Sequence, residues 1–230
     1  MTPADPTSMK PHQSVAHGRS WTVLAILGAI GTGRSTAART LAVRQDASWL
    51  QVDDLRLALQ YSRVSLPERT ERFHFFERTD DVWSLPVDEL VQGFIDVAEL
   101  MVPAVRVVID SHVVTNVPLV LEGDGILPAL LVDPVIRPHA EAGRARFCTV
   151  TASGAEELLE NMIQRGRGMD VGEVAHHRRH AEANAAFNEW LAEESRRHGV
   201  PLVPARPFAS LSDRILIAIQ GSSAREVVQP

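Results

Sequence analysis

From residue 21 onward, short apolar runs alternate with longer segments in which apolar residues recur every three or four positions. The short runs predict β-strands, and the longer periodic segments predict amphipathic α-helices. Regular alternation of the two is typical of an α/β domain built on a mostly parallel sheet. Pro103 interrupts the longest periodic segment, which is therefore expected to form two helices or one kinked helix. The expected strands are 22–27, 48–52, 117–121, 145–150 and 200–203, and the expected helices are 34–44, 54–61, 87–114, 154–165, 173–198 and 210–220.

The patterned region, residues 21–220, is expected to be one domain between two tails. Residues 1–20 hold three prolines and few apolar side chains, so we expect a disordered tail there and a second, loose tail at 221–230. Residues 62–86 break the pattern with prolines, arginines and a tryptophan. We interpret them as an insertion that shapes a substrate pocket.

The apolar run at 21–30 is too short for a membrane span, which needs ~18–20 apolar residues. It has the character of a signal-peptide core, but it leads directly into a patterned glycine loop that signal cleavage would discard. We therefore expect a cytoplasmic protein that makes no contact with a membrane.

Composition narrows the chemistry that this chain can perform. Lys10 is the single lysine among 23 basic residues and lies in the expected tail, which excludes Schiff-base chemistry on a lysine of the domain. The single cysteine, Cys148, excludes an intrachain disulfide and a cysteine-rich zinc site. A net charge of −6 argues against bulk binding to nucleic acid or to a membrane surface.

The most informative segment lies between the first expected strand and the first expected helix. Its glycines permit positive φ angles and close backbone approach, so successive N–H groups can point at phosphate oxygens. The start of the helix adds a partial positive charge at the same place. The spacing fits the phosphate-binding loop G-x-x-x-x-G-[basic]-[ST], with arginine where lysine is usual. The segment consists of Gly28, Ala29, Ile30, Gly31, Thr32, Gly33, Arg34, Ser35 and Thr36.

Three polar side chains of this loop have expected roles. Ser35 is the expected Mg²⁺ ligand, and Thr36 is expected to cap the helix or contact the α-phosphate. Arg34 can bind phosphate, although it is larger, planar and bidentate compared with lysine. Two other interpretations of the glycines stay open: a dinucleotide-binding turn with Asp53 as the ribose-binding acid, and a strand–helix turn without a ligand. The short-chain dehydrogenases are excluded, because no lysine follows Tyr61 at the required spacing.

Carboxylates follow two of the expected strands. Glu122 comes after the run at 117–121, where a ligand of Mg²⁺-bound water or a water-orienting acid lies in a phosphotransferase; the alternative is an acid facing solvent. Asp53 and Asp54 close the second expected strand, and either could accept the proton of an acceptor hydroxyl. Arg56 could then hold an acidic group of the substrate. The alternative for Asp53 is an N-cap of the next helix.

Two basic clusters complete the set of candidates. Arg165 and Arg167 flank a glycine after an amphipathic helix, and we interpret residues 154–172 as a lid that closes on phosphates. The alternative is a helix end whose cations complement the dipole. His176 and His180 share a helix face, but the intervening arginines disfavour a metal cation and no third ligand is suggested. That helix is expected to pack through its apolar side.

Five segments of the chain together resemble a known family. They are the glycine loop, Asp53-Asp54-Leu55-Arg56, Glu122-Gly-Asp-Gly-Ile-Leu-Pro128, Arg165-Gly-Arg167 and Val200-Pro-Leu-Val-Pro-Ala-Arg206-Pro207. They resemble the P-loop small-molecule kinases of the nucleoside-monophosphate-kinase-like group, and within it the 2-phosphoglycerate-kinase-like proteins. The resemblance implies a three-layer α/β/α sandwich with a five-stranded parallel sheet in the order 2-3-1-4-5, a helical lid, and ATP with Mg²⁺. It also implies that Arg206 lies beside the adenine.

The leading hypothesis is a phosphotransferase that acts on a small hydroxylated or acidic metabolite. Loop amides bind ATP, the arginines of loop and lid neutralise phosphate charge, and Ser35 with Glu122 holds Mg²⁺. A second hypothesis, motivated by Arg34, is a nucleotide-binding sensor or interaction module that transfers no phosphate. A third is a kinase for a nucleic-acid end or a nucleotide-sugar, for which the arginines of 63–78 would form a basic groove. The acceptor, the choice between ATP and GTP, and the oligomeric state stay open.

Overall fold

The computed structural model describes residues 19–62, 70–78, 82–165 and 174–221. In this part of the chain, five strands form one sheet in which every neighbouring pair runs parallel, in the order β2-β3-β1-β4-β5. Both the order and the parallel direction confirm the predicted fold class. The strands are β1 (Val23–Leu27), β2 (Ser48–Gln51), β3 (Leu119–Gly123), β4 (Ala145–Thr151) and β5 (Leu202–Pro204).

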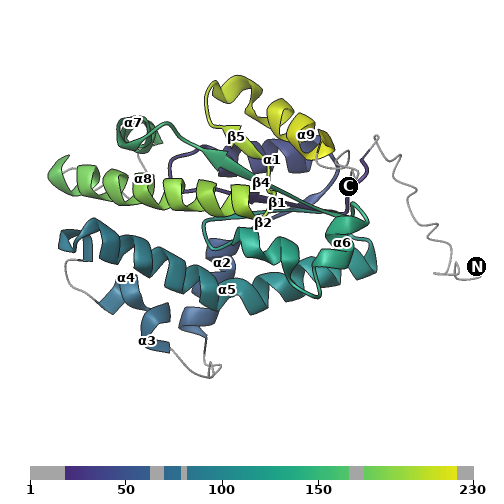
Figure 1. Cartoon of the computed structure of the whole chain (residues 1–230), viewed down its shortest axis with the longest axis horizontal. Helices are drawn as coiled ribbons and strands as arrows, with labels where there is room; N and C mark the ends of the chain where they lie inside the picture. The colour runs from purple at the N-terminus through teal and green to yellow at the C-terminus, as the bar shows by residue number, and fades with distance from the viewer. Residues whose placement is uncertain (1–18, 63–69, 79–81, 166–173, 222–230) are drawn as a thin grey trace, which may run out of the picture.

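Helices cover both faces of the sheet and make a three-layer sandwich. The long helices α5 and α8 lie side by side on one face, and α1 and α9 lie on the other (Figure 1). The α-helices are α1 (Arg34–Arg44), α2 (Val52–Tyr61), α3 (Thr70–Phe73), α4 (Phe75–Arg78), α5 (Val87–Thr115), α6 (Arg137–Glu141), α7 (Ala155–Arg165), α8 (Val174–Arg197) and α9 (Leu211–Gly221). The 3-10 helices are η1 (Val82–Ser84), η2 (Pro128–Val132) and η3 (Phe208–Ser210).

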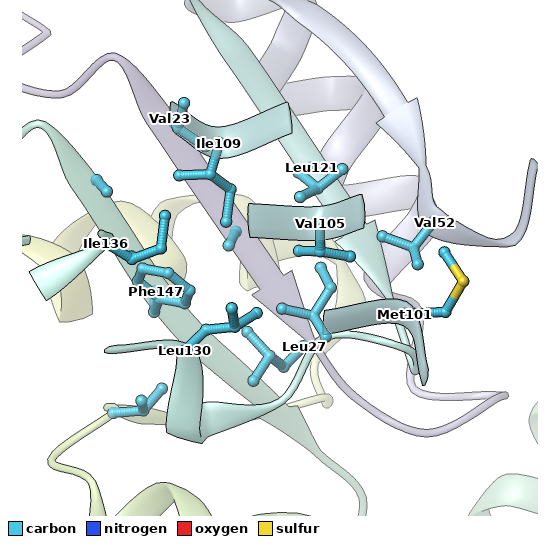
Figure 2. Close-up of a cluster of buried hydrophobic side chains, with 14 of the residues drawn as sticks. Val23, Leu27, Val52, Met101, Val105, Ile109, Leu121, Leu130, Ile136 and Phe147 are labelled. Carbon is cyan, nitrogen blue, oxygen red and sulfur yellow. The ribbon is translucent and has the colours of Figure 1, made fainter. Parts of the chain in front are cut away.

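The central strand β1 supplies side chains to two separate hydrophobic cores. Successive side chains of a strand point to opposite faces, so Val23, Ala25 and Leu27 enter the core beneath α5 and α8. Leu24 and Ile26 enter the core beneath α1 and α9. Burial on both faces explains why this strand reads as a continuous apolar run. Figure 2 shows the first core, in which the labelled neighbours include Val105, Ile109, Leu121 and Phe147.

Helix α5 runs without a break through Pro103, so the open choice between one helix and two resolves to one. Proline removes one N–H donor from a helix and crowds the preceding turn. Here Pro103 lies on the exposed side of the helix, while Met101, Val105 and Ile109 are fully buried on the opposite side. The buried stripe continues past the proline in register, so packing against the sheet holds the helix together.

The helix after β2 begins earlier than the sequence predicted. Val52 is its first residue and Gln51 occupies the N-cap position, so Asp53 and Asp54 lie in the first helical turn. The interpretation of Asp53 as an N-cap is therefore wrong. Val52 is buried against Gly123, where an added Cβ would lie only 2.7 Å from the Val52 Cβ, and this close packing brings Val52 into the helix.

Strand β3 begins two residues later than predicted. The chain leaves α5 through Asn116, which adopts the left-handed conformation, and the Val117 N–H donates to the carbonyl oxygen of His112 at 3.0 Å. Because the Val117 N–H is used at the end of the helix, it is not available to pair with a neighbouring strand. At its other end the strand extends further than predicted, because Glu122 pairs with Ile26 of β1 and Gln51 of β2, so Glu122 lies inside β3 instead of following it.

The described parts of 62–86 pack under α5 as short helices. A Cβ added at Gly93 of α5 would collide with the ring of Phe75 in α4, so glycine at this position lets α4 approach the long helix. Arg72 forms an ion pair with Asp96 of α5 at 3.4 Å. Arg63 and Arg69, which the predicted basic groove requires, lie outside the described residues. The insertion itself stays a prediction.

Several other predictions fall outside the described residues. These are the tail before residue 19, the tail after residue 221 and the lid residue Arg167. Within the described ranges, no helix is both long enough and apolar enough to cross a bilayer.

Candidate functional site

The glycine loop connects β1 to α1 with three glycines at positive φ, of which Gly28 has φ of 153°. Gly31 has φ of 89° and Gly33 has φ of 80°, conformations that side-chain-bearing residues rarely adopt. Gly33 also lies against Phe208, whose ring would be 2.8 Å from an added Cβ. The Thr32 hydroxyl is fully buried and donates to the Ala29 carbonyl oxygen at 2.9 Å, which closes the turn.

Two buried asparagines from other elements form hydrogen bonds to the backbone of the loop. The Ile30 N–H donates to Oδ1 of Asn184 at 3.1 Å, and Nδ2 of Asn161 donates to the Gly31 carbonyl oxygen at 2.9 Å. Asn184 lies in α8 and Asn161 in α7, so both helices hold the loop in place. Neither asparagine was predicted from the sequence. The available signal was an amide on an otherwise apolar helix face, as with Asn161 between Leu158 and Met162.

Arg34 lies inside the protein and is held by three groups. Its Nε donates to Oε2 of Glu122 at 2.9 Å, its Nη1 donates to the Gly28 carbonyl oxygen, and its Nη2 is 3.7 Å from Oδ2 of Asp124. Burial alone would lower the pKa of Arg34, but the negative charges of Asp124, Glu122 and Asp53 outweigh it and raise that pKa. Arg34 is thus a fixed cation at the base of the loop.

Glu122 is the matching fixed anion, and one of its oxygens has no partner. Oε2 accepts from Arg34, whereas Oε1 is buried and receives no hydrogen bond from the described residues. A buried carboxylate oxygen without a donor is costly, so such an atom needs a ligand or an ordered water. Glu122 is 1% exposed, which contradicts the alternative of a strand-end acid that faces solvent.

The two candidate acids of α2 have different surroundings. Asp53 lines a cavity of about 220 Å³, and its Oδ1 lies 3.7 Å from Nε of Arg56. The negative charge of Asp124, followed by burial, raises the pKa of Asp53 to about 6, although Arg34 and Arg56 oppose the shift. Asp54 is exposed, accepts from Nε2 of the neighbouring Gln51 at 3.3 Å, and does not line this cavity.

A larger cavity of about 740 Å³ lies on the opposite side of the glycine loop. Its wall includes Gly31 to Thr36, the α7 residues Gln164 and Arg165, and the ring of Phe208. Ile30 lines the small cavity, while its neighbour Gly31 lines the large one. The Arg34–Asp124 ion pair likewise joins a residue of the large cavity to a residue of the small one. The loop therefore separates two adjoining spaces.

Arg206 contacts α7 instead of the large cavity. Its Nη2 donates to Glu160 and to Oδ1 of Asn161, both at 2.9 Å, and its guanidinium lies 5.7 Å from the centre of the Phe208 ring. Arg206 lines a neighbouring space with Gln164 and Phe208. It thus fastens the segment after β5 to α7 beside the loop.

In the described ranges, no three residues that could ligate a metal ion lie together. The ring of His180 lies 4.0 Å from the ring centre of Trp83. Cys148 is buried in β4, and burial raises the pKa of its thiol to about 12, so it stays protonated.

No protein-family model matches this chain. Over 206 residues it is 24% identical to the 2-phosphoglycerate kinase of Methanocaldococcus jannaschii, in a match that covers 86% of this chain and 63% of that protein. The chain thus spans less than two thirds of the length of this curated relative. The sequence match confirms the predicted resemblance to P-loop kinases.

Solved structures with similar architecture include two small-molecule kinases. The shikimate kinase from Acinetobacter baumannii, in complex with shikimate, has a TM-score of 0.49 and 13% identity, covering 90% of this chain and 97% of that one. The gluconokinase from Sinorhizobium meliloti 1021 has a TM-score of 0.45 and 15% identity, covering 89% and 95%. The fold assignment itself follows from the strand order and the glycine loop.

Proposed function

We propose that this chain is an ATP-dependent phosphotransferase that moves the γ-phosphoryl group of ATP to a hydroxyl group of a small molecule. One observation carries the proposal: the glycine loop has a large cavity on one side and a small cavity containing Asp53 on the other. Phosphoryl transfer requires donor and acceptor oxygens on opposite sides of the transferring group. The match to a protein named 2-phosphoglycerate kinase supports the same class of reaction.

The large cavity is the proposed nucleotide site. Its volume of about 740 Å³ lies within the range of small-ligand pockets. The backbone of Gly31 to Thr36 and the start of α1 offer N–H groups and a partial positive charge to the phosphates. Arg165 adds a cation at the end of α7, and the Phe208 ring offers a flat apolar face to a base.

The residues beside the loop fit a bound Mg²⁺ ion. Ser35 lies on the wall of the large cavity, and the buried Oε1 of Glu122 is an oxygen that lacks a donor. Oxygen ligands with retained waters suit Mg²⁺, so Ser35 would bind the ion directly and Glu122 through water. When bound, Mg²⁺ supplies positive charge to the β- and γ-phosphate oxygens.

On the acceptor side, we assign Asp53 as the proton acceptor. In the proposed step the acceptor's hydroxyl oxygen bonds to the γ-phosphorus, the bond from that phosphorus to the β–γ bridging oxygen breaks, and ADP leaves. The hydroxyl proton passes to the Asp53 carboxylate. Arg56, 3.7 Å from this carboxylate, orients it, and Arg34 lies between the two cavities as a charge-neutralising group. Asp54 has no part in this scheme.

The proposal is tested by binding and turnover measured together. Calorimetry with Mg·ATP reports on the nucleotide site, and ADP release is followed in a panel of acceptors that includes 2-phosphoglycerate, shikimate and gluconate. The double variant Ser35→Ala, Glu122→Gln is expected to lose on the order of a hundredfold or more in kcat, because it removes both proposed Mg²⁺ contacts. Turnover equal to that of the parent chain would contradict the assignment.

A matched control separates this loss from general damage. Ser111 lies on the exposed side of α5, and Glu141 pairs with Arg137 on the surface at 3.8 Å. The double variant Ser111→Ala, Glu141→Gln makes the same chemical changes away from the loop. It is expected to retain the activity of the parent chain, with both variants folded by circular dichroism.

A second candidate function has one observation in its favour. Arg34 is already engaged by Glu122, Asp124 and the Gly28 carbonyl oxygen, so its charge is neutralised within the protein. A loop of this kind could bind a nucleotide without transferring phosphate. Tight Mg·ATP binding with no ADP release in any acceptor, for the parent chain and for Arg34→Lys alike, would favour this nucleotide-binding module.

A further inference from the structure

The small cavity has an aromatic wall assembled from separate elements. The rings of Phe76, Trp83 and Phe94 come from α4, η1 and α5, and their centres are 4.8 to 6.3 Å apart. His180 of α8 lies against Trp83. At these spacings the rings contact one another, and together they present an apolar surface against which a flat apolar group can pack. Such a wall is suited to a ring and poorly suited to a small, fully hydrated sugar acid.

The size of this cavity suits a small ligand. Its volume is about 220 Å³, and a protein cavity of roughly 150 Å³ holds a benzene molecule. The space is therefore sufficient for one six-membered ring with a short polar substituent. The buried residues Val97 and Ala98 add apolar surface to its wall.

Negative charge exceeds positive charge around this space. Of the described residues that line it, Asp53 and Asp124 are acids, Arg56 is the arginine, and His180 is the remaining titratable residue. Arg56 is already committed, because it lies 3.7 Å from Asp53 and 3.6 Å from Glu77 and donates to Gln60 at 2.9 Å.

The neighbouring arginine does not remove this excess. Arg34 lies 3.7 Å from Asp124 but makes its close hydrogen bond, 2.9 Å, to Glu122. Repulsion between Asp124 and Asp53 is the largest cause of the raised pKa of Asp53, which agrees with an excess of negative charge at this point. An incoming carboxylate or phosphate would meet two acids, whereas a hydroxyl or an ammonium group could donate to them.

We infer that the acceptor is a single-ring aromatic alcohol, neutral or carrying one ammonium group, and not an acid. The inference rests on the proposed phosphotransferase function and narrows its substrate class. The ring packs against the surface formed by Phe76, Trp83 and Phe94, the hydroxyl faces Asp53, and an ammonium group pairs with Asp124. The products are ADP and the phosphate monoester of the alcohol, with the hydroxyl proton taken up by Asp53.

Three compounds with one scaffold test this inference on the full chain. 2-Amino-1-phenylethanol, 1-phenylethane-1,2-diol and mandelate share a phenyl ring and a benzylic hydroxyl, and they carry a cation, a neutral group and an anion respectively. Calorimetry is expected to give the tightest binding for the amine, because hydrogen bonds to charged groups are worth more than neutral ones. Mandelate is expected to bind about tenfold more weakly or worse, because its carboxylate would meet Asp53 and Asp124. Mandelate binding as tightly as the amine would overturn the inference.

Two variants then test which residues cause these differences in binding. Asp124→Asn is expected to weaken the amine about tenfold while changing the diol by about twofold or less. Asp213→Asn is the matched control, because Asp213 pairs with Arg44 on the exposed surface at 2.7 Å. Trp83→Leu is a second variant, expected to weaken all three compounds, with Trp49→Leu as its control in the other core. Equal losses for amine and diol in Asp124→Asn, or unchanged binding in Trp83→Leu, would contradict the inference.

The transfer assay distinguishes this inference from the proposed function. ADP release with the amine or the diol supports both. Release with mandelate or another acid in preference to these alcohols overturns the aromatic-alcohol inference and leaves the phosphotransferase standing. Binding of the alcohols without phosphoryl transfer to any acceptor overturns the phosphotransferase proposal.

Discussion

The two cavities beside the glycine loop are built in different ways. Most residues that line the large cavity belong to one segment of the chain between Gly31 and Thr40, to which α7 and the segment from Phe208 to Ser212 add others. The small cavity takes one or a few side chains from each of several elements that are distant in sequence. A phosphate site made of backbone is encoded locally, whereas a site for a specific acceptor depends on how helices pack. The five predictions below test that contrast.

The largest expected effect concerns the small cavity. Asp53→Asn removes the proposed proton acceptor, and kcat is expected to fall by about 10²- to 10⁴-fold, the range typical of general-base residues. The Kd for Mg·ATP is expected to stay within about twofold, because Asp53 lies on the other side of the loop. The exposed neighbour provides the control: Asp54→Asn should change neither constant. If Asp54→Asn lowered kcat as much as Asp53→Asn, the division between a nucleotide cavity and an acceptor cavity would be contradicted.

Next in size is the effect of removing the cation between the cavities. Arg34→Ala leaves Glu122 buried without its partner, which is expected to lower the free energy of unfolding by about 3–5 kcal/mol. For a chain of this length the melting temperature should fall by roughly 6–20 °C. The surface variant Arg44→Ala, which breaks the exposed pair with Asp213, is expected to cost less than about 1 kcal/mol.

Arg34→Lys separates the contribution of the charge at this position from that of the guanidinium geometry. It keeps the positive charge next to Glu122, so most of the stability is expected to remain. The loop then has the usual lysine, and we expect phosphotransferase activity to be kept or raised. A melting temperature as low as that of Arg34→Ala would show that the guanidinium geometry, and not its charge, holds this region together.

A smaller expected effect concerns the large cavity. Gly33→Ala combines a left-handed backbone with a Cβ that collides with Phe208, so Mg·ATP binding should weaken on the order of a hundredfold. Gly199→Ala is the matched control, because Gly199 also has a positive φ, 71°, but an added Cβ meets nothing within 4 Å. Ligands of the small cavity should bind Gly33→Ala normally. Loss of both kinds of binding would mean that the cavities are not independent.

The smallest expected effect is on the pH profile. Asp53 must be deprotonated to accept a proton. The negative charge of Asp124 and burial raise its pKa to about 6, against the opposing effect of Arg34 and Arg56. kcat/KM should be level above that pH and fall about tenfold per unit below it. The free energy of unfolding shows the opposite trend. The raised pKa means that the folded state binds this proton more tightly than the unfolded state. The contribution of Asp53 to stability therefore rises as pH falls from about 6 toward 4. A profile that is flat between pH 5 and 7 would exclude Asp53 as the base.

The same contrast explains how much could be predicted from the sequence. The apolar run of β1, the spacing of the glycines and the period of α1 are local patterns in one continuous segment, and the structure has all three. The order of the strands was available through the resemblance to P-loop kinases, and the structure confirms it.

Features that depend on contacts between distant segments could not be predicted. The choice between Asp53 and Asp54 follows from the starting residue of α2, which Val52 fixes by packing on Gly123. The support from Asn184 depends on where α8 passes the loop. In both cases the deciding partner lies far away in the chain, so no local pattern records it.

Gly93 is a position through which the acceptor specificity of this protein could change. It lines neither cavity, yet its missing side chain is what lets Phe75 and α4 sit close to α5, and α4 carries Phe76 of the aromatic wall. A larger residue at 93 would push that wall without touching a bound acceptor. Natural or laboratory evolution toward acceptors of another shape therefore has a route through positions 93 and 75 that leaves the phosphate machinery untouched, so new specificities can arise without first losing the reaction.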